Sequence, residues 1–175
     1  MRFVFLLMAH ADLIAFLSAA AAAMSLMLGL AFAWGARRPF VYLALSFFAL
    51  GYLLLEEYLL LTDSLLLYPW LAEWAAPLTL LIPVGLYFYL TDGTGAQGQS
   101  RLALHLVPTL LIAVNFSPLY FRTANFKYHY LYKEMYERLA PDMPTEYLQY
   151  RVVWVDEWLV DVLLIGQFLC YAFLI

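Results

Sequence analysis

The chain has 175 residues, of which 66% are hydrophobic and only 13% are charged, and its formal net charge is −4. Soluble domains carry about 25% charged residues, so this composition excludes an ordinary water-soluble fold and indicates a membrane protein. The small negative net charge argues against a nucleic-acid-binding surface within these residues.

The first apolar block covers residues 11–34 and has no charged side chain after Asp12. About 20 residues of helix cross a hydrocarbon core of roughly 30 Å, so this block is long enough to span a membrane. Small residues between Ser18 and Ser25 favour close packing against another helix. They also resemble a signal-peptide cleavage site, but the apolar run is too long for a signal sequence.

The second and third apolar blocks cover residues 39–61 and 74–90. Pro83 lies near the middle of the third block and predicts a kink there, because proline lacks the N–H and crowds the preceding turn. The apolar stretch 65–72 between the two blocks is too short to span. We expect it to lie along the membrane surface or to form a re-entrant bend.

The fourth block, 102–120, contains Pro108 as a second predicted kink, and the fifth runs from 156 to 175. Between them lies a polar segment at about 121–155, rich in tyrosine and with balanced charges. We expect this segment to pack on the membrane surface, with a short amphipathic helix at 127–139. Nothing polar follows Cys170, the single cysteine, which suggests a fragment of a longer protein.

The short loops predict the orientation, because lysine and arginine stay on the cytoplasmic side. Arg37, Arg38 and Arg101 flank two of these loops, whereas the loop after residue 61 carries Asp63 and Glu73. The N-terminus and the 121–155 segment are therefore expected outside. The predicted fold is one domain, 1–175, an all-α polytopic bundle of five transmembrane helices in the inner (plasma) membrane.

Acidic residues at the predicted outer end are candidates for sensing or binding a ligand. Glu56 and Glu57 are foremost, because carboxylates at membrane depth are costly and often mark functional sites. Adjacent side chains on a helix point about 100° apart, so the two do not form a catalytic dyad. His10 and Asp12 lie at the same end, where they could form a cation or proton-sensing site. Hydrated interfacial side chains are the alternative for all four residues.

Asp161 lies deeper in the last block and is a candidate buried partner of His129 or Arg151, with an interfacial aspartate as the alternative. His105 lies near the predicted cytoplasmic end, where a structural role is expected. The sequence has no serine–histidine, cysteine–histidine or HExxH pattern. We therefore expect no enzyme, no cofactor and no metal site.

Two motifs resemble the membrane module of bacterial AraC-type transcriptional regulators: Ile82-Pro83-Val84-Gly85-Leu86-Tyr87-Phe88-Tyr89-Leu90 and, after a polar linker, Leu104-His105-Leu106-Val107-Pro108. Ile82 stands where that family usually has glycine. The resemblance implies about seven helices followed by a cytoplasmic helix-turn-helix domain, so the last two helices and the DNA-binding domain are absent from this chain. The candidate positions for kinks and coupling are Pro83, Tyr87, Tyr89, His105 and Pro108.

The leading functional hypothesis is a non-enzymatic sensory module of a one-component transcriptional regulator. It would pass an external or membrane signal to a cytoplasmic DNA-binding domain, with the lipid bilayer and a second copy of the chain as further partners. A structural or accessory subunit of a larger membrane complex is the alternative. A small transporter is another, but only Asn115, Asp161 and Gln167 approach the mid-depth polar positions that it needs, and no internal repeat supports it.

Overall fold

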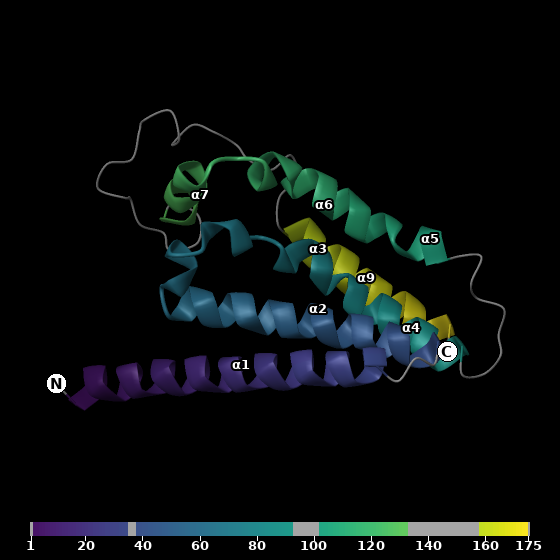
Figure 1. Cartoon of the computed structure of the whole chain (residues 1–175), viewed down its shortest axis with the longest axis horizontal. Coiled ribbons are helices and arrows are strands. Elements are labelled where there is room, and N and C mark those ends of the chain that lie inside the picture. The colour runs from purple at the N-terminus through teal and green to yellow at the C-terminus, as the bar shows by residue number, and fades with distance from the viewer. Residues whose placement is uncertain (1, 35–37, 93–101, 133–157, 175) are drawn as a thin grey trace.

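The computed structural model describes residues 2–34, 38–92, 102–132 and 158–174, and all regular structure in these ranges is helical (Figure 1). The elements are α1 (Arg2–Trp34), α2 (Arg38–Leu61), η1 (Ser64–Leu66), η2 (Pro69–Leu71), α3 (Ala75–Thr79), α4 (Leu81–Asp92), α5 (Leu102–His105), α6 (Val107–Tyr120), α7 (Ala124–Tyr130) and α9 (Trp158–Leu174). The predicted all-α class is therefore confirmed for the described residues.

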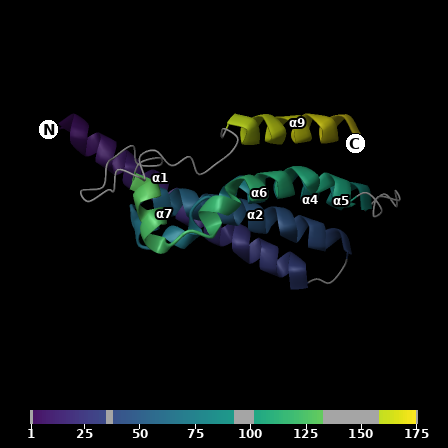
Figure 2. The same ribbon diagram turned by 90° about the horizontal axis from the view of Figure 1, so that it is seen from above.

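The long helices run up and down alongside one another (Figure 1). One end of the bundle holds the N-terminus, η1, η2 and α7, and the other end holds the C-terminal ends of α4 and α9. Figure 2 shows α9 on the side of α4 and α6 that faces away from α1. The chain reverses direction between α1 and α2, as expected for antiparallel helices joined by a short loop.

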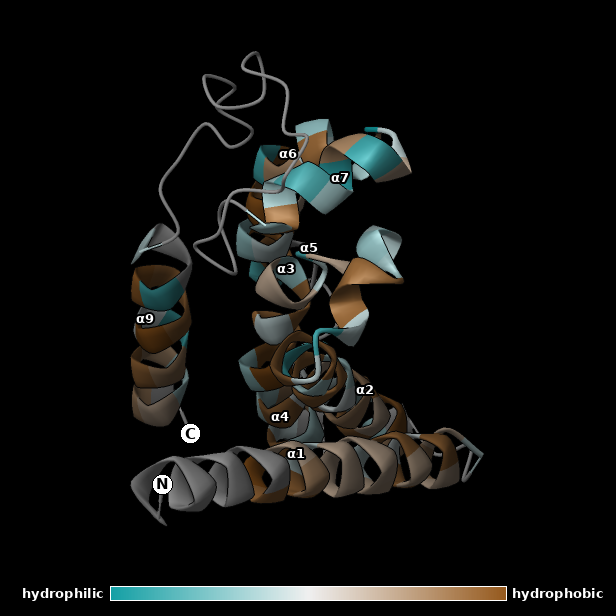
Figure 3. Cartoon of the chain, turned by 90° about the vertical axis from the view of Figure 1, so that its left-hand side faces the viewer, coloured by the Kyte–Doolittle hydropathy of each residue, from teal (hydrophilic) through white to brown (hydrophobic). Residues whose placement is uncertain are grey.

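Two helices are long and apolar enough to cross a membrane, over Leu13–Trp34 and Pro39–Leu61. A third candidate is the bent pair Pro69–Thr79 and Leu81–Thr91, whereas the apolar parts of α6 and α9 are shorter. The outward surfaces of α1 and α2 are largely hydrophobic (Figure 3), with Phe16 and Met27 among their exposed side chains. This surface suits lipid tails better than water.

A stripe of small residues on α1 packs against α2. Its members are buried and alternate at spacings of three and four: Ala15, Ser18, Ala22, Ser25 and Gly29. A Cβ added at Gly29 would lie 3.3 Å from the Phe48 ring of α2. The close packing predicted for this part of α1 is therefore confirmed, since only small side chains let two helix backbones approach so closely.

The third apolar block, predicted as one helix kinked at Pro83, is divided into α3 and α4, which are bent by 43° at Leu80. Pro83 has no N–H to donate to the Thr79 carbonyl four residues earlier, so the helical hydrogen bonds are interrupted at that turn. The Pro83 side chain is buried. A second break falls at Leu106, two residues before Pro108, between the end of α5 and the start of α6.

The helix predicted at 127–139 begins earlier than expected. α7 starts at Ala124 because the hydroxyl of Thr123 accepts a hydrogen bond from the Phe126 N–H at 3.3 Å, which caps the helix. The part of the 121–155 segment after residue 132 lies outside the described residues. The prediction of one amphipathic helix reaching residue 139 is therefore tested only over its first turns.

Candidate functional site

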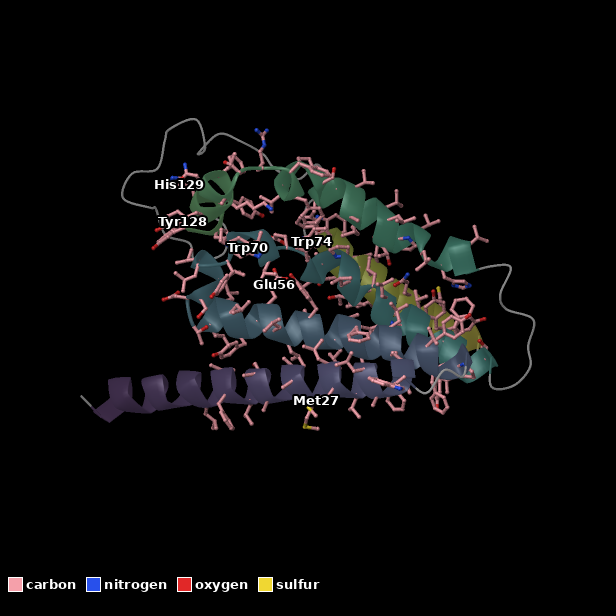
Figure 4. All side chains as sticks on the ribbon, viewed as in Figure 1. Met27, Glu56, Trp70, Trp74, Tyr128 and His129 are labelled. Atoms are coloured by element: carbon pink, nitrogen blue, oxygen red, sulfur yellow. The ribbon has the colours of Figure 1, made fainter. Side chains whose placement is uncertain are left out.

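A buried polar cluster lies where α2 approaches the irregular chain between η2 and α3. We call it the Glu56 cluster; its members are Tyr52, Glu56, Glu73, Tyr120, Lys127 and Tyr130. Figure 4 shows Glu56 between α2 and the segment that carries Trp70 and Trp74. The cluster thus joins side chains from α2, the turn before α3, α6 and α7.

Both carboxylate oxygens of Glu56 accept hydrogen bonds from backbone groups. Oε1 accepts the N–H of Glu73, and Oε2 accepts the N–H of Ala75 at 2.8 Å. Tyr52, one turn earlier on α2, donates its hydroxyl to the Leu71 carbonyl at 2.7 Å. Because buried backbone N–H and C=O groups need hydrogen-bond partners, these two side chains supply the partners that the irregular 71–75 segment needs.

Glu73 is held at three of its atoms by three different elements. Its N–H bonds to Glu56, its carbonyl accepts the Tyr120 hydroxyl at 2.9 Å, and its Oε1 accepts the Tyr130 hydroxyl at 3.0 Å. Its φ of 68° is left-handed, a conformation that costs a non-glycine residue about 1–2 kcal/mol. These contacts hold a strained residue at the point where α2, α6 and α7 meet.

Lys127 of α7 is buried, with 6% of its surface exposed. Its Nζ donates to the carbonyl of Tyr120, the last residue of α6, at 3.0 Å. A cation at a helix C-terminus is favourable, because the last carbonyls lack helical partners. Burial nevertheless lowers the pKa of the Lys127 ammonium group. The Tyr120 ring stacks on Trp74, with ring centroids 4.0 Å apart.

A second cluster lies toward the opposite end of the bundle, and we call it the His105 cluster: Tyr87, Phe88, His105 and Tyr171. A hydrogen bond of 2.8 Å joins His105 Nδ1 and the Tyr171 hydroxyl. The Tyr87 ring stacks on Tyr171 at 4.7 Å between centroids. Tyr89 lies apart from this cluster and contacts Phe40 instead, at 6.2 Å between ring centroids.

The structure separates Glu56 from two other acidic candidates. Glu57 is exposed, because one residue along a helix turns the side chain by about 100°. Asp161 is exposed on α9, which agrees with the interfacial aspartate and not with the buried partner, the two alternatives that the sequence left open. Its neighbours Leu163, Gln167 and Tyr171, spaced four apart, form the more buried stripe, and Asp161 lies off that stripe.

The remaining candidates are only partly described. His10 and Asp12 lie on the first part of α1, but their side chains lie outside the described residues. The same holds for Arg151, whereas His129 is buried in α7. In the described ranges, no group of three or more His, Cys, Asp or Glu side chains is placed to hold a metal ion.

No pattern in the sequence indicates that Tyr120, Tyr130 and Lys127 belong to the Glu56 cluster. Tyr120 and Tyr130 reach Glu73 across 47 and 57 residues of chain, and Lys127 stands in a polar segment where a solvated cation is expected. The one available signal is the four-residue spacing of Tyr52 and Glu56, which places both on one helix face.

Comparison of the chain with protein-family models, curated proteins and solved structures found no match.

Proposed function

We propose that the chain is the membrane-embedded sensory module of a one-component transcriptional regulator and that it acts without catalysis. A signal from outside the cell, or from the membrane itself, changes the packing at the Glu56 cluster. The change passes along the bundle to the His105 cluster and then to a cytoplasmic DNA-binding domain. The resemblance of the 82–90 and 104–108 motifs to AraC-type regulators supports the nature of that output.

The observation that carries this proposal is the set of three contacts at Glu73. A change at Glu56 alters the position of a residue that also bonds α6 and α7. The bend of 43° between α3 and α4 lets the two halves of that span move differently. A sensor needs a part of the structure that can adopt two conformations, one of which the signal stabilises, and the Glu73 contacts together with the bent span are that part in this proposal.

We further propose five crossings, made by α1, α2, the bent pair α3–α4, the broken pair α5–α6, and α9. The Glu56 cluster then lies at the outer face of the inner membrane and the His105 cluster at the cytoplasmic face. Two span candidates and one bent pair support the first three of these crossings. The basic residues Arg37, Arg38 and Arg101 of the sequence support the orientation, and Arg38 begins α2, at the opposite end of that helix from Glu56.

This topology predicts which loops a membrane-impermeant maleimide reaches in intact cells. In a background carrying Cys170→Ser, the Asp63→Cys variant is expected to be labelled from outside. The Gly95→Cys variant is expected to be labelled only after the membrane is opened. Labelling in the reverse pattern contradicts the orientation, and labelling of both variants from outside contradicts the number of crossings.

The sensory function is tested by fusing a dimerising helix-turn-helix domain after Ile175 and measuring transcription from its operator. We expect Glu56→Gln to change reporter output several-fold at equal protein level, because it removes one acceptor from the 71–75 segment. Glu57→Gln, on the exposed face of the same helix, is the matched control. Equal output from wild type and both variants contradicts the proposal.

A structural subunit of a larger membrane complex is the second candidate. It is favoured by the position of α9, which packs mainly on α3 and α4 and leaves Val162, Ile165 and Phe168 exposed. This candidate predicts that the chain copurifies with a fixed partner and that Glu56→Gln leaves the reporter output unchanged.

A further inference from the structure

We propose that the Glu56 carboxyl group is a proton-operated latch on the segment between η2 and α3. When ionised, Glu56 holds the segment through the N–H groups of Glu73 and Ala75; when protonated, it loses one of these two hydrogen bonds and its hold on the segment weakens. The latch is a property of the bundle itself and does not require the regulatory output proposed above.

The hydrogen-bond geometry belongs to the ionised form. An ionised carboxylate accepts on both oxygens, whereas a neutral carboxyl group carries a donor O–H on one of them. Oε1 and Oε2 of Glu56 each face a backbone donor, the N–H of Glu73 and the N–H of Ala75. Protonation of either oxygen therefore sets an O–H against an N–H and removes one of the two hydrogen bonds.

Burial of Glu56, in contrast, favours the neutral form of its carboxyl group. Glu56 has 6% of its surface exposed, and both of these donors are neutral backbone groups rather than cations. Placing a charge in a medium of low dielectric is costly, and the neutral form avoids that cost. The two hydrogen bonds favour the ionised form and burial favours the neutral form. A change in pH therefore shifts the equilibrium between the two forms of Glu56.

The charges around Glu56 also oppose one another. The titratable groups of the same cluster are Tyr52 on α2, Glu73 before α3, Tyr120 on α6, and Lys127 and Tyr130 on α7. Glu57, the next residue on α2, adds a second negative charge nearby although its own side chain is exposed. The two other carboxylates disfavour a further negative charge, whereas the Lys127 ammonium group favours one. Lys127 bonds the Tyr120 carbonyl at 3.0 Å, so its charge belongs to the same network.

Release of the latch has a defined structural consequence. Without Glu56, the left-handed Glu73 loses the hydrogen bond to its N–H, so its backbone relaxes toward an ordinary conformation. Its bonds to Tyr120 and Tyr130 are then disturbed. Trp74 lies between the two latched N–H groups and stacks on Tyr120, so its ring reports the movement.

The test uses the full chain in detergent micelles with Trp74 as its single tryptophan; Trp34, Trp70, Trp154 and Trp158 are replaced by Phe. We expect one reversible change in Trp74 emission as the pH falls from about 9 to about 4. Glu56→Gln is expected to abolish the change and to hold the emission at its acid value throughout. Glu57→Gln, the matched control, is expected to keep it.

If the emission change persists in the Glu56→Gln variant, another group titrates and the proposal is overturned. A constant emission of the parent chain over this pH range also overturns it.

If Glu56→Gln does not fold, a hydrophobic carbodiimide, which reacts with protonated carboxyl groups, gives the second measurement. Labelling of Glu56 in the parent chain is expected to rise over the same pH range as the fluorescence change, and labelling that does not vary with pH overturns the latch. A latch without reporter output contradicts only the regulatory proposal, and reporter output without a latch contradicts only this one.

Discussion

Replacing Gly85 by leucine is expected to prevent α2 and α4 from packing together. A Cβ added at Gly85 would overlap the Ser46 hydroxyl oxygen and the Tyr42 carbonyl oxygen, and would lie 3.2 Å from the Ser46 backbone nitrogen. The Ser46 side chain can rotate, but the Tyr42 carbonyl belongs to the backbone of α2. The helices must therefore separate, and the 2.9 Å bond from Ser46 to the Ile82 carbonyl is lost with them.

Alanine at position 85 is the milder form of the same change. We expect Gly85→Ala to lower the free energy of unfolding by about 1–3 kcal/mol, the usual cost of overpacking a tight contact. Gly85→Leu is expected to leave no cooperatively folded bundle. Both effects are measured by unfolding the purified chain from mild detergent into a denaturing one, with helical circular dichroism as the signal.

The matched control is Gly166 of α9, where an added Cβ meets nothing within 4 Å. Gly166→Ala is expected to leave the free energy of unfolding unchanged or to raise it by up to about 1 kcal/mol, because alanine has the higher helix propensity. If the alanine variants at 85 and 166 unfold alike, the close contact between α2 and α4 is contradicted.

The second large effect is expected from Glu56→Leu. Leucine fills much of the same volume but leaves the N–H groups of Glu73 and Ala75 without their acceptors. Each buried unsatisfied group costs about 1–3 kcal/mol, so we expect a loss of about 2–5 kcal/mol in the free energy of unfolding. Hydrogen exchange should show loss of protection at the amides of residues 73 and 75 while the amides in the middle of α1 and α2 stay protected.

Glu57→Leu is the control for this prediction, because Glu57 is exposed on the same helix one residue further on. We expect its unfolding free energy to stay within about 0.5 kcal/mol of the parent chain. Equal losses at 56 and 57 indicate that removal of an acid from the end of α2, and not removal of the backbone contacts, is responsible.

The pattern of apolar blocks predicted most helix boundaries. The block 39–61 became α2, Arg38–Leu61, because a continuous apolar run lies between Pro39 and the polar turn at Thr62 to Ser64. Pro83 and Pro108 marked the two broken helices, since proline has no N–H to continue the preceding turn, although Pro118 lies within α6 without ending it. These are local properties, and they need no knowledge of neighbouring segments.

Only the tertiary structure decided which polar side chains are buried together. Glu56 and Glu57 are equivalent in the sequence, and the side of α2 that meets the 71–75 segment decides between them. Asp161 and Tyr171 lie in one apolar block, yet only Tyr171 faces the bundle, where it bonds His105 across 66 residues of chain. The physical reason is that helix periodicity fixes the angles between side chains but not the face that a partner covers.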